Sequence, residues 1–234
     1  NGDRFFIGGV GSYDHTRSDV GSRFGDGTID SESAGLGLTA TWLGAGGAYV
    51  DAQLRANWFE ADLRSDTLGA LATDTGGFGY AASIEGGKRV DLGGDLWLTP
   101  QAQLSWARAD FDAFTGSNGE QVSLSDAESL RLRAGLAVDR DRTWADAQGN
   151  LQRSHLYAIA NLSYDFAGDS TATVSGTALT TDPAAWSGEI GLGFTRGFDD
   201  DRHQLYGEVN ASTGLANFGQ SYAVSGRIGF RATW

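Results

Sequence analysis

The sequence predicts an all-β protein whose strands form an antiparallel transmembrane β-barrel. Polar and apolar residues alternate from one end of the chain to the other, and the connections alternate between short and long. The closing segment Tyr222–Trp234 shows the pattern most clearly, with apolar residues at one parity and Arg227 and Arg231 at the other. Because successive side chains of a strand point to opposite faces, one face of this segment suits lipid and the other suits water.

Composition agrees with a β-barrel and excludes several other classes. The 234 residues include 35 glycines but only two prolines, and a proline inside a strand would break the hydrogen-bond ladder. No stretch of roughly 18 apolar residues is present, so we expect no transmembrane helix. The absence of cysteine excludes disulfides and thiolate metal sites. A net charge of -13 without a basic stripe disfavours a nucleic-acid partner.

Alternation with a period of two residues predicts about ten strands. Many of them approach the ~9–11 residues that a tilted membrane strand needs. The predicted strands are Arg4–Thr16, Ser33–Leu43, Tyr49–Leu63, Tyr80–Val90, Leu96–Phe111, Ser129–Val138, Leu156–Phe166, Trp186–Thr195, Gln204–Ser212 and Tyr222–Trp234.

The connections fit a barrel with short periplasmic turns and longer outer loops. Counting backwards from a periplasmic C-terminus places the longest connections outside, and only Asp139–Ser154 is an unusually long periplasmic turn. Within the last long connection, Thr171–Thr177 has the pattern of a small extended hairpin. The predicted long connections are Ser18–Ser31, Arg64–Gly79, Thr115–Glu128 and Ala167–Ala185.

The apolar parity has two interpretations. In a barrel it faces lipid, whereas in a soluble two-sheet sandwich it faces a core and the arginines of the other parity meet water. Strand length favours the barrel, and so do aromatic residues near the strand ends, which are typical of the girdles at a membrane interface. Those aromatic residues are Trp42, Trp58, Trp106, Tyr164, Trp186 and Trp234.

The polar parity predicts a lumen lined by charges of both signs. Such a lining would hydrate the lumen, and Arg–carboxylate pairs would fix neighbouring strands and could hold a polypeptide segment in the pore. The predicted lumen-lining residues are Asp51, Arg55, Glu85, Arg131, Arg133, Glu189, Glu208, Arg227 and Arg231.

No motif indicates catalysis, a metal site or a cofactor. The sequence lacks the nucleophile elbow of the α/β-hydrolases and the zinc-binding helix of metalloproteases. His15, His155 and His203 lie far apart near strand ends, and we interpret them as solvated surface residues. The run Asp199–Asp201 is interpreted as a solvated turn, because it lacks the ligand spacing of a calcium loop.

Seven segments together resemble the C-terminal translocator β-barrel of monomeric (type Va) autotransporters. Each segment alone is a weak signal, but their order and spacing are specific and cover nearly the whole chain. They are 79–87, Leu98–Trp106, Leu130–Leu136, Tyr157–Tyr164, Trp186–Gly193, Leu205–Val209 and Gly226–Phe230.

The resemblance implies a function and a domain organisation. Residues 1–234 would be a translocator domain of the bacterial outer membrane, supplying strands 3–12 of a twelve-stranded barrel. The first two strands, a pore helix and the secreted passenger would lie upstream. Such a barrel anchors and exports its passenger by type V secretion and is not an enzyme.

The resemblance also implies partners. The bilayer with its lipopolysaccharide, the outer-membrane barrel assembly machinery and the chain's own passenger and pore helix are expected, in a monomer without nucleic acid. The terminal strand resembles the signal that the assembly machinery reads. Its expected signal residues are Tyr222, Val224, Gly226, Ile228, Phe230 and Trp234.

Two alternatives remain open from sequence. A ten-stranded outer-membrane protease would need Asp and His clustered on outer loops, but only Asp14 and His15 lie near an outer rim, and adjacent residues of a strand point in opposite directions. A passive pore or a soluble β adhesin is the other alternative.

Overall fold

The computed structural model describes residues 2–21, 25–116, 119–125, 127–168, 170–181, 185–198, 202–216, 218–219 and 221–233. The described residues form β-strands and turns, without a helix. Accordingly, none of them belongs to a helix with the length and apolarity needed to cross a membrane.

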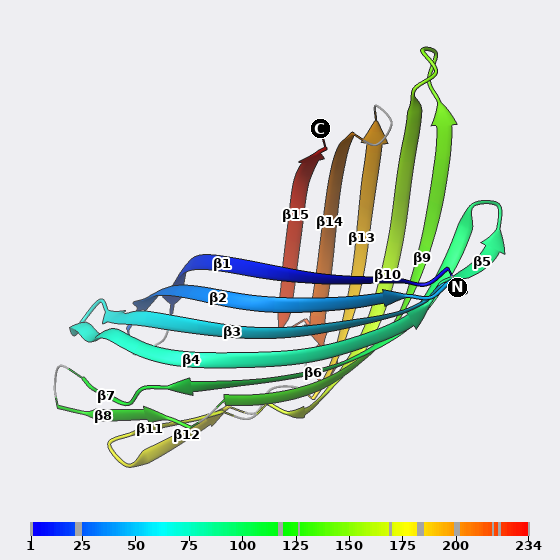
Figure 1. The fold of residues 1–234 in the computed structure, drawn as a ribbon. Helices are drawn as coiled ribbons and strands as arrows, with labels where there is room; N and C mark the ends of the chain where they lie inside the picture. The colour runs from blue at the N-terminus through cyan, green and yellow to red at the C-terminus, as the bar shows by residue number, and fades with distance from the viewer. Residues whose placement is uncertain are drawn as a thin grey trace.

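Eleven strands form one curled antiparallel sheet (Figure 1). Ten follow one another in chain order, and the short strand β5 extends the line of β4 along β6. The strands are β1 (Arg4–Val20), β2 (Gly27–Leu43), β3 (Ala48–Ser65), β4 (Gly69–Lys88), β5 (Val90–Gly93), β6 (Leu96–Phe111), β9 (Ala127–Ala145), β10 (Leu151–Ala167), β13 (Trp186–Phe198), β14 (His203–Gly214) and β15 (Tyr222–Ala232).

All ten predicted strands are confirmed, but three predicted connections are wrong. In the supposed loop Ser18–Ser31, β1 continues to Val20 and β2 begins at Gly27. Strand β3 continues to Ser65 and β4 begins at Gly69, so most of the supposed loop Arg64–Gly79 is strand. The supposed connection Asp139–Ser154 is likewise a hairpin of β9 and β10. Alternation of polar and apolar residues requires one apolar environment, so it fades where both faces of a strand meet water although backbone pairing continues.

The turn between β9 and β10 is tight for a local reason. The Asp146 carboxylate accepts hydrogen bonds from the backbone amides of Gln148 (3.0 Å) and Asn150 (2.9 Å), and Gly149 supplies a positive φ of 89°. Desolvation alone would raise the pKa of Asp146, but the amides of Asn150 and Gln148 outweigh it and leave that pKa below its ordinary value.

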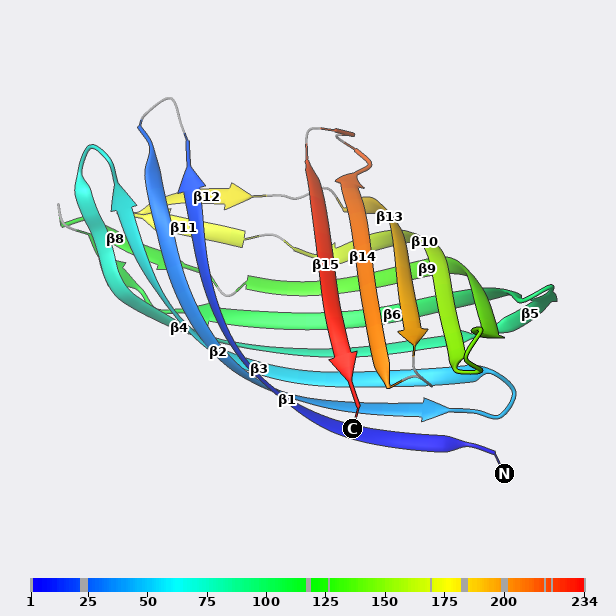
Figure 2. The same ribbon diagram turned by 90° about the horizontal axis from the view of Figure 1, so that it is seen from above.

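The remaining strands form a second, smaller sheet (Figure 2). It has the order β12-β11-β8-β7, made of β7 (Phe114–Thr115), β8 (Gln121–Leu124), β11 (Ser170–Val174) and β12 (Thr177–Thr181). The hairpin of β11 and β12 lies where the sequence predicted one, but its pairing with β8 joins two separate connections. The end of the large sheet that carries this smaller sheet is called the loop end. The opposite end, with the tight turns at 44–47, 94–95 and 146–150, is called the turn end.

The large sheet buries polar side chains and exposes apolar ones, which is the reverse of a sheet in a water-soluble protein. The buried polar side chains include Asp139 and Asn161, which are 6% and 7% exposed, whereas Ile190 and Leu192 are 67% and 61% exposed. A soluble sandwich would bury its apolar face under a second sheet, and no described element covers this one. The sandwich interpretation is therefore wrong, and the exposed apolar face requires an apolar surrounding.

The sheet is open between its first and last strands (Figure 2). Among the described residues, β1 pairs only with β2 and β15 only with β14. Backbone groups along these edges have no strand partner there, and such edges are not stable in contact with lipid.

Candidate functional site

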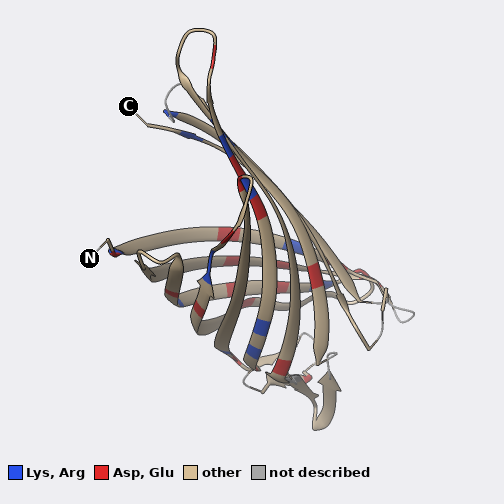
Figure 3. Ribbon diagram, turned by 90° about the vertical axis from the view of Figure 1, so that its right-hand side faces the viewer, with Lys and Arg blue, Asp and Glu red and all other residues tan. Residues whose placement is uncertain are grey.

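Strand register places the nine predicted charged residues on one face of the sheet. Asp51 lies directly opposite Glu85, and Glu208 lies directly opposite Arg227. The other charged residues reach the same face through even spacing and the register of β6, β9, β10 and β13. Charged positions recur along these strands in Figure 3.

This polar face is the inner face of the curl, because its side chains reach across intervening strands. Arg133 of β9 donates to Glu85 of β4 at 2.5 Å, passing over β6. Arg55 of β3 likewise donates to Ser12 of β1 at 2.7 Å, passing over β2. Side chains converge in this way only on the concave side of a curved sheet, so we call this surface the inner wall.

Two ion-pair networks stabilise the middle of the inner wall. Glu85 binds Arg133 and also accepts a hydrogen bond from the Tyr49 hydroxyl at 2.7 Å, so three strands are joined through one carboxylate. Arg131 binds Asp165 with two parallel hydrogen bonds of 2.6 and 3.0 Å. Bidentate pairs of this kind fix geometry as well as contributing energy.

A third network joins the last strands of the sheet. Glu208 of β14 accepts hydrogen bonds from Arg227 (2.9 Å), Asn210 (2.6 Å) and the Tyr157 hydroxyl. Tyr157 belongs to β10, and its ring reaches Glu208 by crossing directly over Gly193 of β13. A side chain at position 193 would block this crossing.

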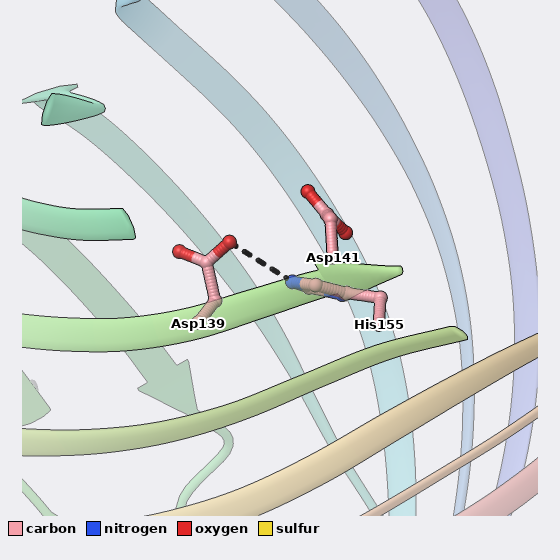
Figure 4. A group of neighbouring side chains, drawn as sticks. All are labelled: Asp139, Asp141 and His155. Atoms are coloured by element: carbon pink, nitrogen blue, oxygen red, sulfur yellow. Dashed lines mark ion pairs between the residues drawn. The ribbon is translucent and has the colours of Figure 1, made fainter. Parts of the chain in front are cut away.

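The inner wall also holds a cluster near the turn end that sequence reasoning missed. Asp139, Asp141 and His155 converge there, with 3.3 Å between His155 Nε2 and Asp139 (Figure 4). Arg89 forms ion pairs with both carboxylates, and its guanidinium lies 4.4 Å from the centre of the Trp97 ring. The interpretation of His155 as a solvated residue is therefore wrong.

The cluster has ligand atoms suited to a divalent cation, but its carboxylates are already engaged. Asp139, Asp141 and His155 each offer one ligand atom within 4.8 Å of the others. A cation binding there would have to displace the Arg89 guanidinium, so the arrangement is that of a structural salt bridge. The alternation of the sequence could have revealed this cluster, because Asp139 and Asp141 continue the two-residue spacing of Arg131 and Arg133 along the same strand.

Comparison with known proteins places this architecture in a family. A family model described as "Autotransporter beta-domain" matches residues 1–210. The chain belongs to the autotransporter β-domain family. Proteins of this family reside in the bacterial outer membrane.

Individual relatives of this β-domain are also autotransporters. It is 41% identical to an "Adhesin BmaC autotransporter" of Brucella suis over 98% of its own length and 7% of the adhesin. It is 31% identical to a "Pertactin autotransporter" of Bordetella bronchiseptica over 91% of its length and 23% of that protein. The chain therefore spans less than a quarter of these two relatives.

Solved structures show the same fold. The transport unit of the autotransporter AIDA-I from Escherichia coli matches 98% of the chain with a TM-score of 0.79 at 20% identity, and the chain covers 76% of that unit. The β-domain of the Bordetella autotransporter BrkA matches with a TM-score of 0.64, also at 20% identity.

Not every predicted charged residue of the inner wall forms an ion pair with a residue of opposite charge. Asp51 accepts hydrogen bonds from Thr41 (2.5 Å) and Gln53 (2.8 Å), and Glu189 accepts one from Asn161 (2.8 Å). Within the described part of the chain, Arg231 forms no ion pair with a carboxylate. The wall thus combines tightly paired charges with others left for water or a further partner.

The signal residues predicted for the terminal strand lie on one face of that strand, as far as the structure describes them. The five within β15 share its outward, apolar face, as their common parity and the register with β14 require. The sixth, Trp234, lies outside the described residues, and so does the predicted turn Asp199–Asp201.

We expect Arg133→Met to destabilise the β-domain by about 1–3 kcal/mol, because it leaves the largely buried Glu85 carboxylate without its cation. Urea unfolding of the whole protein refolded into vesicles measures this free energy. Adding Glu85→Gln should restore most of the loss, and Arg231→Met, which removes an arginine without a described carboxylate partner, should change little. An equal loss for Arg231→Met would show that pairing at Glu85 is not what stabilises the wall.

Proposed function

We propose that this β-domain anchors a passenger in the outer membrane and exports it through the pore that the inner wall lines. The observation that carries the proposal is the wall itself: a single sheet with exposed hydrocarbon side chains outside and paired charges inside. A polypeptide in transit meets water and polar side chains along this inner face, while the outer face stays in lipid.

The inner wall suits an unfolded chain better than a selective small-molecule site. Its charges have both signs and most are satisfied by neighbours, so they offer hydration without one strong binding point. The family supports export, since its members are autotransporters, and the chain's relatives are far longer than this domain. The passenger and a pore helix are expected partners of this wall.

Assembly would proceed through the terminal strand. Strand β15 has one unpaired edge among the described residues, and an extended edge can add to an edge of another sheet through backbone hydrogen bonds. We infer that the assembly machinery of the outer membrane binds β15 in this way, with its outward apolar residues already facing lipid.

No enzymatic activity is proposed. A protease site would need Asp14 and His15 to act together, but they lie on opposite faces of β1. Asp14 approaches Arg55 on the inner wall at 3.7 Å, whereas His15 approaches Glu32 on the outward face at 3.7 Å.

Site-specific photo-crosslinking during export tests the proposal. A photoreactive residue at Gln103, on the inner wall, should capture the passenger in cells making the whole protein, whereas one at the neighbouring Leu104 should capture lipid. Heat-modifiable migration of both variants confirms assembly. Passenger captured equally from both positions, or from Leu104 alone, would contradict export through the pore.

A further inference from the structure

The outward face carries charges of opposite sign at its two ends. At the turn end, the formally charged outward side chains of the described strands are Lys88, Arg140, Arg142 and Arg196. At the loop end, carboxylates outnumber cations. The carboxylates there are Asp19, Asp30, Glu32, Glu60, Asp62, Asp110 and Glu128, and the cations are Arg17, Arg64 and Arg108.

The spacing of the two groups matches a bilayer. On β9, twelve residues lead from Glu128 to Arg140, and the outward positions between them are uncharged, including Leu132, Leu136 and Val138. At about 3.3 Å per residue and a tilt of about 45°, this length spans about 28 Å across the membrane. The hydrocarbon core is about that thick, so Arg140 and Arg142 lie at the level of the lipid headgroups of one leaflet.

The cations at the turn end have no protein counter-ion in the part of the chain that the structure describes. Lys88, Arg140 and Arg142 are exposed and make no ion pair there, in contrast to Arg131 and Arg133 of the inner wall, which both bind carboxylates. An outward cation at this depth meets lipid headgroups instead of protein carboxylates.

An aromatic side chain adds to the same surface. Arg196 lies with its guanidinium 4.2 Å from the centre of the Trp144 ring and donates to Gln152 at 3.4 Å. Strand register places Arg196 opposite Ser154, which in turn lies opposite Arg142, so the Trp144 ring holds this guanidinium near the other outward cations.

We propose that Lys88, Arg140, Arg142 and Arg196 form a binding surface for anionic phospholipids of the periplasmic leaflet. The phosphate of such a headgroup supplies the missing counter-charge, and the negative surface potential of an anionic leaflet attracts nearby Lys and Arg side chains. The carboxylates at the loop end repel the same lipids, so the domain favours them at one leaflet only. This inference rests on the proposed insertion in the outer membrane but not on passenger export.

Spin-labelled lipids test the proposal directly. The whole protein is reconstituted in phosphatidylcholine vesicles containing a trace of spin-labelled phosphatidylglycerol or phosphatidylcholine, and electron paramagnetic resonance measures the motionally restricted fraction. We expect phosphatidylglycerol to associate about two- to fivefold more strongly at low salt, and this preference to weaken as salt screens the charges.

Matched variants locate the effect. Combined Lys88→Gln, Arg140→Gln and Arg142→Gln, which leaves only Arg196, should remove most of the preference, whereas combined Asp30→Asn, Glu32→Gln and Glu60→Gln at the loop end should not lower it. The single variant Arg142→Gln, beyond the apolar band, should reduce the preference partly and serves if the triple variant does not assemble. Conservative Arg140→Lys should retain it.

Three results would overturn the proposal: equal association of both lipids with the wild-type protein, an undiminished preference in the assembled triple variant or in Arg142→Gln, or loss of the preference in the loop-end variant. Failure of export is distinguishable, because passenger on the cell surface is measured separately by protease accessibility. A protein that inserts and selects phosphatidylglycerol without displaying its passenger would retain this inference and contradict the proposed function.

Discussion

Replacing Ile228 with arginine should cost the assembled β-domain about 2–4 kcal/mol, whereas Ser225→Arg on the same strand should cost less than about 1 kcal/mol. Ile228 is 76% exposed on the outward face of β15, where an arginine would have to leave water for hydrocarbon. Ser225 lies on the inner face, opposite Asn210, where Arg227 and Arg231 already occur. The two substitutions add the same side chain three positions apart, so they separate the effect of the face from the effect of the residue.

Two measurements check this expectation. Urea unfolding in vesicles gives the free energy difference, and heat-modifiable migration of outer-membrane fractions gives the assembled amount in cells. Because β15 is also the proposed segment for the assembly machinery, Ile228→Arg should reduce assembly in cells more than its loss of stability alone explains. Equal stability of the two variants would show that the outward face of β15 does not meet lipid.

Sequence alone predicted most of the strands, for a physical reason. In the middle of each strand one face meets an apolar surrounding and the other water, so residue type reports the direction of the side chain. This is why the charged residues of β3, β4 and β9 could be assigned to one face. The same logic failed beyond the apolar band, as at Arg64–Gly79, since both faces of those residues meet water.

The networks of the inner wall could not be predicted in the same way. Parity indicates that Arg133 and Glu85 share a face, but their contact passes over β6 and depends on the register of three strands. The pairing of β8 with β11 similarly joins connections about fifty residues apart. Such contacts follow from curvature and register, which a single strand does not encode.

Gly193→Leu should destabilise the assembled β-domain by about 1–3 kcal/mol, because the position lies directly under the Tyr157 ring. A Cβ atom there would come within 2.3 Å of Tyr157 Cζ and 2.5 Å of its hydroxyl oxygen. The ring would have to leave its place between β10 and β14, and Glu208 would lose one of its hydrogen-bond donors. The backbone of position 193 needs no special φ, so the effect comes from the space alone.

A second substitution isolates this cause. Tyr157→Ala removes the ring, so the double variant should be more stable than the sum of the two single losses by at least about 1 kcal/mol. Gly86→Leu is the matched control, since a Cβ on the outward face of β4 meets nothing closer than a backbone oxygen at 3.7 Å and the added side chain would contact lipid. Urea unfolding of the three single variants and the double variant completes the cycle. Additive losses would mean that Tyr157 and Gly193 do not act together, and the crossing between β10 and β14 would then be no more than a chance contact.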